Sequence, residues 1–287
     1  MTVRPLLNLL RMEQWTKNVF VLAGCVFANQ ILNVDLLTKS IIATISFCLI
    51  SSSVYVFNDC MDLNYDKDHP RKKNRPIANG LISVKSGFII SAVLLLLSLI
   101  ASVFASNILL TIIITYFILN LAYSLNLKKL VIIDVFCIAC GFMLRIFAGT
   151  LAIGIEPSEW IIICTMMLSL FLGFSKRYAE MTDNLSTKRM VISKYDKNTL
   201  LIFLSITLSC TIMSYGLYTI SDKTVVAHNT KNLIYSLPIV MFGLLRYLYI
   251  VIYEQKGEDT FKDILKDSQL KTTLAAYIIF ILSVIIL

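Results

Sequence analysis

The most informative stretch of the sequence places oxygen-bearing side chains every fourth residue where a long apolar segment ends. These residues are Asn58, Asp62 and Asp66. If the helix continues past Phe57, their side chains lie on one face, one turn apart. Oxygen donors without His or Cys favour Mg²⁺, which keeps several waters and shares its coordination shell with substrate phosphates. We therefore predict a magnesium site in which Asn58, Asp62 and Asp66 are both the metal ligands and the catalytic residues.

A basic cluster follows these acids closely. Lys72 and Arg75 are near enough in the chain to hold an anion whose other face meets the metal. The arginine fork matches the geometry of a phosphate. The alternative is a solvated loop of mixed charge, which is common in proteins. The regular spacing at the end of an apolar segment favours a site for a diphosphate bound together with Mg²⁺.

The elements that must position these residues are transmembrane helices. Of the 287 residues, 57% are hydrophobic and only 15% are charged, and the mean hydropathy is +0.77. A soluble domain carries about 25% charged residues, so the composition excludes a soluble globular protein and a disordered one. We predict an all-α polytopic membrane protein with a single domain over residues 1–287. Nine apolar segments are assigned as membrane spans: 18–33, 38–57, 83–105, 107–125, 130–153, 159–176, 199–220, 232–253 and 270–287.

The basic residues predict the orientation of these spans. The 26 Lys and Arg outnumber the 18 Asp and Glu, and most of them lie near the N-terminus and in the loops 58–82, 177–198 and 254–269. Because cytoplasmic loops carry the excess of Lys and Arg, we predict that the N-terminus and these loops are cytoplasmic and that the C-terminus is outside. We attribute the excess of positive charge to this topology and expect no nucleic-acid partner. The predicted location is a bacterial-type plasma membrane, where membrane lipids surround the protein.

The acidic motif also resembles a known family. The pattern Asn58-Asp59-x-x-Asp62-x-x-x-Asp66, with the basic cluster behind it, is similar to the first aspartate-rich motif of the UbiA-type intramembrane prenyltransferases. This resemblance implies a UbiA-like bundle of about nine transmembrane helices with an active site that faces the cytoplasm. It also implies that Mg²⁺ is the cofactor.

Four further segments, at 14–18, 123–128, 141–149 and 176–180, resemble one branch of that family, the decaprenyl-phosphate phosphoribosyltransferases. The branch implies transfer of 5-phosphoribose from phosphoribosyl pyrophosphate to a polyprenyl phosphate of the decaprenyl type. Diphosphate is released, and the product feeds synthesis of a cell-envelope polysaccharide. The resemblance implies the following substrate-binding residues: Gln14, Lys17, Asp59, Lys72, Arg75, Tyr123, Lys128, Arg145, Lys176, Arg177 and Glu180.

One segment departs from the wider family. Aromatic prenyltransferases of this fold carry a second aspartate-rich motif after the sixth span, where this chain has Lys176 and Arg177 ahead of Glu180 and Asp183. Two cations suit a donor with an additional phosphate, as in phosphoribosyl pyrophosphate. Two alternatives remain. The first is a prenyltransferase that moves a prenyl group to an aromatic or other acceptor, which would share the first motif. The second is an anion transporter, whose internal repeats and broken midplane helices the sequence does not show.

Two ionisable residues in the segment 130–153 leave more than one interpretation. Arg145 is costly in a membrane span unless it faces the protein interior or an aqueous cavity. It therefore forms a salt bridge between helices, contacts an anion or supports the residues of the acidic motif. Asp134 either pairs with a basic group or hydrogen-bonds a ribose. The sequence does not determine the length of the polyprenyl acceptor or the number of metal ions. It is compatible with both a monomer and a homo-oligomer.

Overall fold

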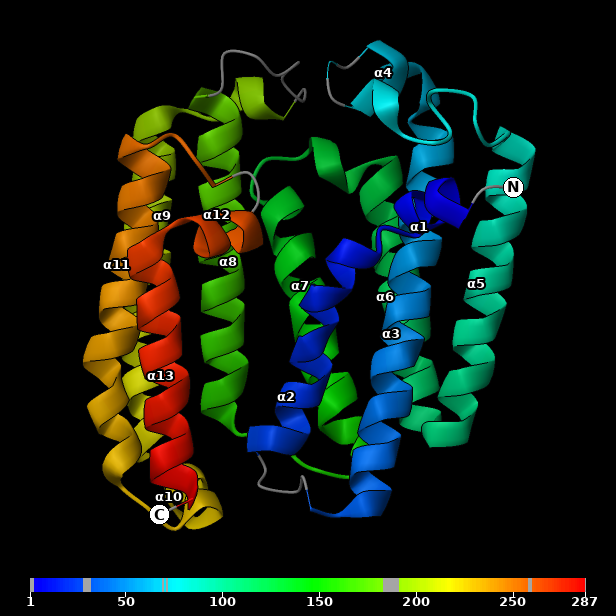
Figure 1. Ribbon diagram of the computed structural model, residues 1–287. Helices are drawn as coiled ribbons and strands as arrows, with labels where there is room; N and C mark the ends of the chain where they lie inside the picture. The colour runs from blue at the N-terminus through cyan, green and yellow to red at the C-terminus, as the bar shows by residue number, and fades with distance from the viewer. Residues whose placement is uncertain are drawn as a thin grey trace. The chain divides into compact units, whose positions relative to one another are not determined.

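The structure is a computed structural model that describes residues 3–27, 32–68, 70, 72–182, 191–257 and 260–286. Every regular element in these residues is a helix, and no strand occurs among them (Figure 1). The all-α prediction is therefore confirmed. The α-helices are α1 (Val3–Leu10), α2 (Val19–Phe27), α3 (Val34–Met61), α4 (Leu63–Asp68), α5 (Val84–Ala105), α6 (Asn107–Leu125), α7 (Ile133–Gly149), α8 (Glu159–Thr182), α9 (Lys197–Ile220), α10 (Asp222–His228), α11 (Leu237–Tyr253), α12 (Thr260–Lys266) and α13 (Ser268–Ile286). Short 3₁₀ helices are η1 (Met12–Asn18), η2 (Lys72–Asn74), η3 (Leu127–Lys129), η4 (Leu151–Ile153), η5 (Ile192–Lys194) and η6 (Asn232–Ser236).

Seven helical segments of the described chain are long and apolar enough to cross a membrane, and they match the second to eighth predicted spans. They are Val34–Met61, Val84–Ala105, Asn107–Leu125, Ile133–Ile153, Glu159–Thr182, Lys197–Ile220 and Asn232–Tyr253. The chain is thus an integral membrane protein.

The two remaining predicted spans correspond to helices outside this set of seven. The ninth corresponds to α13, which is apolar over Ser268–Val284. For the first, the nine residues of α2 extend only about 14 Å, against a hydrocarbon core of about 30 Å. Residues 28–31 of that predicted span lie outside the described residues. The number of nine spans stays a prediction.

The chain divides by its internal packing into two compact units. Unit 1 comprises Met1–Lys128 and Met143–Pro157, and unit 2 comprises Lys129–Phe142 and Ser158–Leu287. The first part of α7 therefore belongs to unit 2 and its last part to unit 1. The single domain predicted for residues 1–287 stays a prediction.

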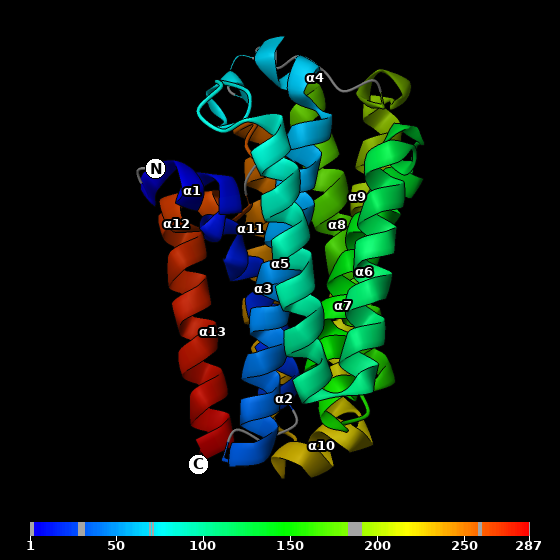
Figure 2. The same cartoon turned by 90° about the vertical axis from the view of Figure 1, so that its right-hand side faces the viewer.

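In unit 1, α3 and α5 run side by side, as Figures 1 and 2 both show. Small hydroxyl residues allow this close approach. Ser53 Oγ donates a hydrogen bond to the backbone oxygen of Ser91 at 2.8 Å, and Ser98 Oγ donates one to the backbone oxygen of Ser46 at 2.8 Å. Small and hydroxyl residues are typical of helix interfaces in membranes, where apolar contact alone gives little preference for protein over lipid.

A single residue, Ser106, separates α5 from α6, and the two helices form a tight hairpin. α5 ends at Ala105 and α6 begins at Asn107. Ser106 adopts an extended conformation between them, and its Oγ accepts the Leu109 N–H at 3.1 Å. A serine at this position satisfies one of the unpaired N–H groups at the start of α6, so one residue both ends α5 and caps α6.

Two glycines bring α2 and the end of α7 into backbone contact within unit 1. A Cβ added at Gly149 would lie 1.8 Å from the backbone oxygen of Val21, and one added at Gly24 would lie 2.1 Å from the backbone oxygen of Gly149. No side chain fits at either position while the helices stay at this distance.

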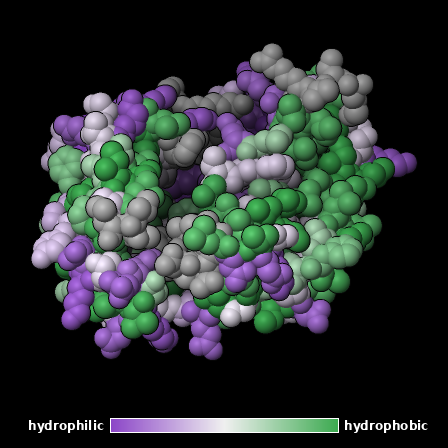
Figure 3. All heavy atoms as spheres, turned by 60° about the horizontal axis from the view of Figure 1, so that its bottom comes forward, coloured by the Kyte–Doolittle hydropathy of each residue, from purple (hydrophilic) through white to green (hydrophobic). Residues whose placement is uncertain are grey.

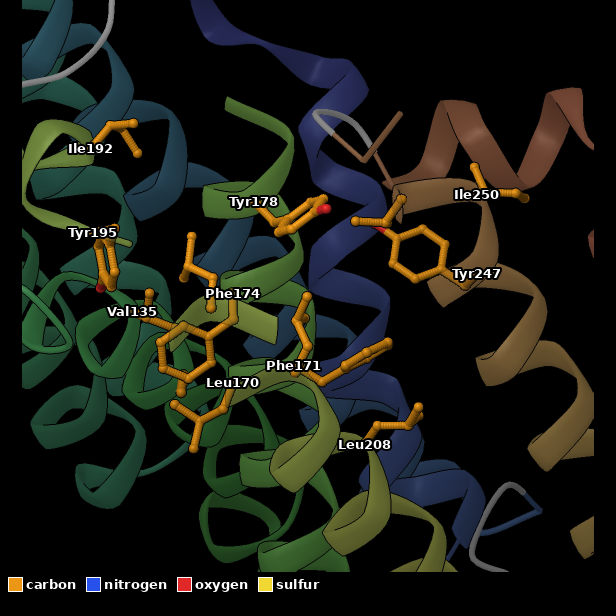
Figure 4. Close-up of a cluster of buried hydrophobic side chains, with 14 of the residues drawn as sticks. Val135, Leu170, Phe171, Phe174, Tyr178, Ile192, Tyr195, Leu208, Tyr247 and Ile250 are labelled. Carbon is orange, nitrogen blue, oxygen red and sulfur yellow. The ribbon is translucent and has the colours of Figure 1, made fainter. Parts of the chain in front are cut away.

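Unit 2 is held by one hydrophobic cluster from α7, α8, η5, α9 and α11 (Figure 4). The close-up shows Tyr195 beside Val135 on one side of the cluster and Tyr247 on the other. Tyr195 directly precedes Asp196, whose carboxylate caps α9 by accepting the N–H groups of Asn198 and Thr199. The cap therefore fixes where α9 begins and, with it, the position of Tyr195.

The surface agrees with a protein that contacts lipid. Hydrophobic side chains cover broad areas of the face shown in Figure 3, and hydrophilic ones gather in separate groups. Along α5, Ile89, Leu96 and Val103 are all more than half exposed. Their seven-residue spacing puts them on one face of the helix, so this face presents an apolar stripe suited to acyl chains.

The predicted orientation can be tested by labelling cysteines introduced into the loops. In a variant without the seven native cysteines, Lys73→Cys and Lys194→Cys should react with a membrane-impermeant thiol reagent only from the cytoplasmic side, because they lie in the basic loops. Lys223→Cys, on α10, should react only from outside. All three side chains are exposed. Labelling of intact cells and of inverted vesicles checks this, and the reverse pattern would place the basic loops outside the cell.

Candidate functional site

The acidic motif lies where α3 gives way to α4. α3 ends at Met61, and Asp62 forms the junction with φ −91° and ψ 12°. The backbone nevertheless keeps the helical spacing, because Asp62 N–H donates to Asn58 O at 2.9 Å and Asp66 N–H donates to Asp62 O at 2.8 Å. The expected continuous helix is thus interrupted at one residue, while the four-residue repeat of the motif is retained.

A single arginine joins two buried carboxylates of the motif. Arg75 Nη1 lies 3.1 Å from Asp59 Oδ1 and 2.6 Å from Asp66 Oδ2. The two aspartate side chains are only 2% and 1% exposed. Buried carboxylates of this kind need a cationic partner, since an unpaired buried charge is strongly destabilising. Arg75 therefore holds the segment after α4 against the end of α3.

Arg11 is a second cation on the same carboxylate, and the sequence analysis did not single it out. Its guanidinium pairs with Asp59 and lies over the ring of Tyr55, 4.9 Å from the centroid. Arg11 adopts a left-handed conformation (φ 49°, ψ 49°) between α1 and η1. It is 48 residues from Asp59 along the chain, so no spacing pattern could have linked the two.

The other members of the motif contact the end of α6 and η3. Lys128 Nζ donates to Asp62 Oδ1 at 2.9 Å, and the Asp62 side chain is 37% exposed. Ser124 Oγ donates to Asn58 Oδ1. The structure therefore brings the predicted residues Asn58, Asp62 and Lys128 together, and Ser124 joins them as a partner that the prediction did not include.

The donor set suits a hard divalent cation such as Mg²⁺. Asn58, Asp62 and Asp66 offer oxygen atoms only. Asp66 Oδ1 is buried and accepts no hydrogen bond from the described residues. Within the described part of the chain, no three His, Cys, Asp or Glu side chains gather closely enough to hold a metal alone. These residues would thus supply part of a shell that waters and a diphosphate complete, as is usual for Mg²⁺.

The other residues predicted in unit 1 lie on several elements. Gln14 is half-buried and Lys17 exposed, both on η1. Lys72 is half-buried, with Nζ over the ring of Tyr65 at 4.8 Å, and Tyr123 is half-buried on α6.

Arg145 is a buried residue of α7 that binds side chains of two other elements. It is 5% exposed, and its Nε donates to Asn18 Oδ1 at 2.8 Å. Its Nη2 donates to the Tyr116 hydroxyl at 3.1 Å, and its guanidinium lies over the rings of Tyr116 and Phe47. It therefore faces the protein interior, as a charge in a membrane span requires.

In unit 2, the predicted residues Arg177 and Glu180 form a buried group with Asp134. Arg177 Nε lies 3.0 Å from Asp134 Oδ2, and Nη1 pairs with Glu180 one turn further along α8. Of the two interpretations of Asp134, the structure supports pairing with a basic group. Lys176, the neighbouring cation, is half-buried, and Asp183 lies outside the described residues.

Tyr195 completes this group from the loop before α9. Its hydroxyl donates to Asp134 Oδ1 at 2.8 Å and accepts the Ile132 N–H at 2.7 Å. Burial raises the pKa of the Tyr195 phenol above its ordinary value, and the Asp134 carboxylate acts in the same direction. Tyr195 therefore remains protonated at neutral pH and keeps donating to Asp134.

Known proteins share both the sequence pattern and the fold. The UbiA prenyltransferase family matches residues 18–263. The chain is 34% identical over 220 residues to the decaprenyl-phosphate phosphoribosyltransferase of Corynebacterium glutamicum, a match that spans 74% of this chain and 66% of the relative, just under two thirds of its length. It is 30% identical over 226 residues to the enzyme of the same name from Mycolicibacterium smegmatis, covering 76% of this chain and 71% of the relative.

The fold is similar to that of a UbiA homolog from Archaeoglobus fulgidus whose structure was solved with GPP and Mg²⁺. The TM-score is 0.73 at 18% identity, over 99% of this chain and 100% of the homolog. At this identity the similarity concerns the fold alone. The match over residues 18–263 shows that the chain belongs to the UbiA prenyltransferase family.

Proposed function

We propose that this chain transfers the 5-phosphoribosyl group of phosphoribosyl pyrophosphate to a polyprenyl phosphate and releases diphosphate, on the cytoplasmic side of the membrane. Membership in the UbiA family supports a transferase. The names of the relatives from Corynebacterium and Mycolicibacterium support the choice of donor and acceptor. The observation that carries transfer from a diphosphate donor is the arrangement of the acidic motif, in which carboxylates able to hold a metal lie beside cations able to hold phosphate oxygens.

The cations and acids of unit 1 have separate tasks in this proposal. Asn58, Asp62 and Asp66 would hold Mg²⁺, which neutralises charge on the diphosphate as the C1–O bond breaks. Arg75 and Lys128 pair with Asp66 and Asp62, and in this proposal they also donate hydrogen bonds to the oxygens of the departing diphosphate. Charge stabilisation by groups that are in place before the reaction needs little rearrangement in the transition state.

The acceptor needs no strong general base. A phosphate monoester has a second pKa of about 6, so its oxygen is anionic near neutral pH. That oxygen attacks C1 of the ribose, and the electron pair of the broken C1–O bond leaves with the diphosphate. No proton has to be removed, which agrees with a chain of 287 residues that has only two histidines.

The alternative is a prenyltransferase that takes a prenyl diphosphate as its donor. Both reactions use the first motif, so this motif does not separate them. The segment at 176–180, which replaces the second motif of the wider family, bears on the choice between the two donors. Half-buried Lys176 puts a cation where a second set of aspartates would serve a second metal, and this favours a donor with an additional phosphate.

Diphosphate release from the purified protein tests the proposal. With Mg²⁺, phosphoribosyl pyrophosphate and a polyprenyl phosphate, we expect one diphosphate for each phosphoribosyl lipid formed, and none in EDTA. A prenyl diphosphate in place of phosphoribosyl pyrophosphate is the parallel reaction. Transfer from the prenyl diphosphate without release from phosphoribosyl pyrophosphate would replace the proposal by its alternative.

A further inference from the structure

One serine of α3 bonds to both sides of the turn between α1 and η1. Ser52 Oγ donates to the backbone oxygen of Leu10 at 2.8 Å and accepts the indole N–H of Trp15 at 3.0 Å. A hydroxyl has one donor and two acceptor sites, so both bonds form at the same time. Leu10 is the last residue of α1, and Trp15 lies on η1. The buried hydroxyl of Ser52 thus holds the end of one element and the middle of the next against α3.

The residue between these two contacts has a strained backbone. Arg11 has φ 49° and ψ 49°, a left-handed conformation that residues other than glycine adopt rarely. Such a conformation persists where the surroundings enforce it, and it is common at functional sites. The Arg11 N–H donates to Asn8 O, and the Arg11 carbonyl oxygen accepts the Gln14 N–H. Bonds of this local kind occur in many turns, whereas the two bonds of Ser52 tie this turn to another helix.

The turn determines where the Arg11 guanidinium lies. The guanidinium pairs with Asp59 and lies 4.9 Å from the centroid of the Tyr55 ring. Ser52, Tyr55 and Asp59 follow one another on α3 at intervals of three and four residues, so they share a face of that helix. Arg11 therefore extends along this face, from the serine that holds its turn to the carboxylate that takes its charge.

Arg11 and Arg75 together balance two acids of the motif. Arg75 Nη1 contacts both Asp59 and Asp66, and the two carboxylates are almost fully buried. Arg11 supplies the second positive charge, on Asp59. Without it, the two carboxylates would share the Arg75 guanidinium, and this end of the motif would carry one more negative charge. An added negative charge attracts a metal cation and repels a diphosphate.

We propose that Ser52 and Trp15 are positioning residues of the diphosphate site, which hold the strained turn that keeps the charge of Arg11 on Asp59. The inference rests on the proposed function, but only on the part that both donor classes share, the binding of a diphosphate together with Mg²⁺. Neither residue contacts the diphosphate. Their effect is to lower the negative charge that the diphosphate meets.

The binding of two probes to the purified protein tests this inference. Arg11→Gln should weaken the binding of inorganic diphosphate at saturating Mg²⁺ by about tenfold, the order of the effect of one unit charge at about 10 Å. It should tighten the binding of Mg²⁺ alone, because the same charge acts on a cation with the opposite sign. Ser52→Ala should change both dissociation constants in the same directions by about two- to fivefold, since it removes hydrogen bonds and keeps the guanidinium. Titration calorimetry measures both constants. Partial unfolding would instead lower the number of binding sites and tighten the binding of neither probe.

A second variant and a matched control separate positioning from a general loss of packing. Trp15→Phe removes the indole N–H and should act in the same directions as Ser52→Ala. In the background of Arg11→Gln, neither substitution should have a further effect, because residues that act through a shared partner are not additive. Ser53→Ala is the control. Ser53 is the next residue of α3, is equally buried, and donates to the backbone oxygen of Ser91 on α5 at 2.8 Å. Its loss should leave both constants unchanged.

Each contrary outcome is specific. If Ser52→Ala and Ser53→Ala change the diphosphate constant alike, or if Ser52→Ala has the same effect with and without Arg11, the positioning role is wrong. If Arg11→Gln weakens the binding of both probes, the charge balance is wrong. A wild type that binds diphosphate with Mg²⁺ but releases none from phosphoribosyl pyrophosphate overturns the proposed donor alone. A wild type that binds no diphosphate overturns both the proposed function and this inference.

Discussion

Asp66→Asn should lower turnover by about 10²- to 10³-fold, the loss typical when one group that stabilises developing charge is removed from an active site. Asp66 is 1% exposed, its Oδ2 pairs with Arg75, and its Oδ1 is buried without a hydrogen-bond donor among the described residues. The substitution keeps the size of the side chain but removes the charge that a metal requires. Diphosphate release at saturating donor and acceptor is the measurement.

The control for this variant lies two residues away. Asp68 is exposed on the same short helix, α4. Asp68→Asn removes the same charge from the same element and should leave turnover within about twofold, because an exposed charge contributes little. Equal losses in the two variants would mean that the charge of the loop matters and not the position of Asp66. Full activity of the wild type in EDTA would end the metal interpretation.

Arg177→Gln should destabilise the protein by about 3–5 kcal/mol, the cost of breaking a buried ion pair by removing one partner. The guanidinium is 1% exposed, and it pairs with the equally buried Asp134 and with Glu180. Without it, Asp134 keeps a buried negative charge, to which the Tyr195 hydroxyl still donates. The change should appear as a lower free energy of unfolding in detergent micelles.

The neighbouring cation provides the comparison. Lys176 is half-buried, so Lys176→Gln should change the free energy of unfolding by less than about 1 kcal/mol. Donor affinity is therefore better tested with Lys176→Gln, where a loss of binding cannot be attributed to a loss of fold. If Lys176 holds a phosphate of the donor, affinity should fall by about 10- to 150-fold. If it only enforces topology, affinity should not change.

The sequence predicted those parts of the molecule that depend on short-range patterns. The spacing of Asn58, Asp62 and Asp66 follows from helical geometry, and it survives the interruption at Asp62 because the backbone hydrogen bonds continue. The hairpin at Ser106 follows from the bounds of the predicted spans 83–105 and 107–125, which leave a single residue to connect them.

The sequence could not predict which charges pair across long distances in the chain. Arg11 and Asp59 meet because the turn between α1 and η1 adopts a left-handed conformation at Arg11. The residue types in this segment do not predict such a turn. The pairing of Arg177 with Asp134 was likewise only one of two interpretations of Asp134, since hydrophobic patterns place an ionisable residue in a helix but do not choose its partner.

The contact between Gly24 and Gly149 has a consequence for how this sequence can vary. At both positions the obstacle to a Cβ is a backbone oxygen, which cannot turn aside as the end of a flexible side chain can. Even alanine would have to push the helices apart. In a library that randomises each position in turn and selects for function, Gly24 and Gly149 should therefore admit no replacement, while exposed residues on α5 such as Leu96 accept many apolar ones. During evolution, either glycine can be replaced only after other substitutions have changed how α2 packs against the end of α7.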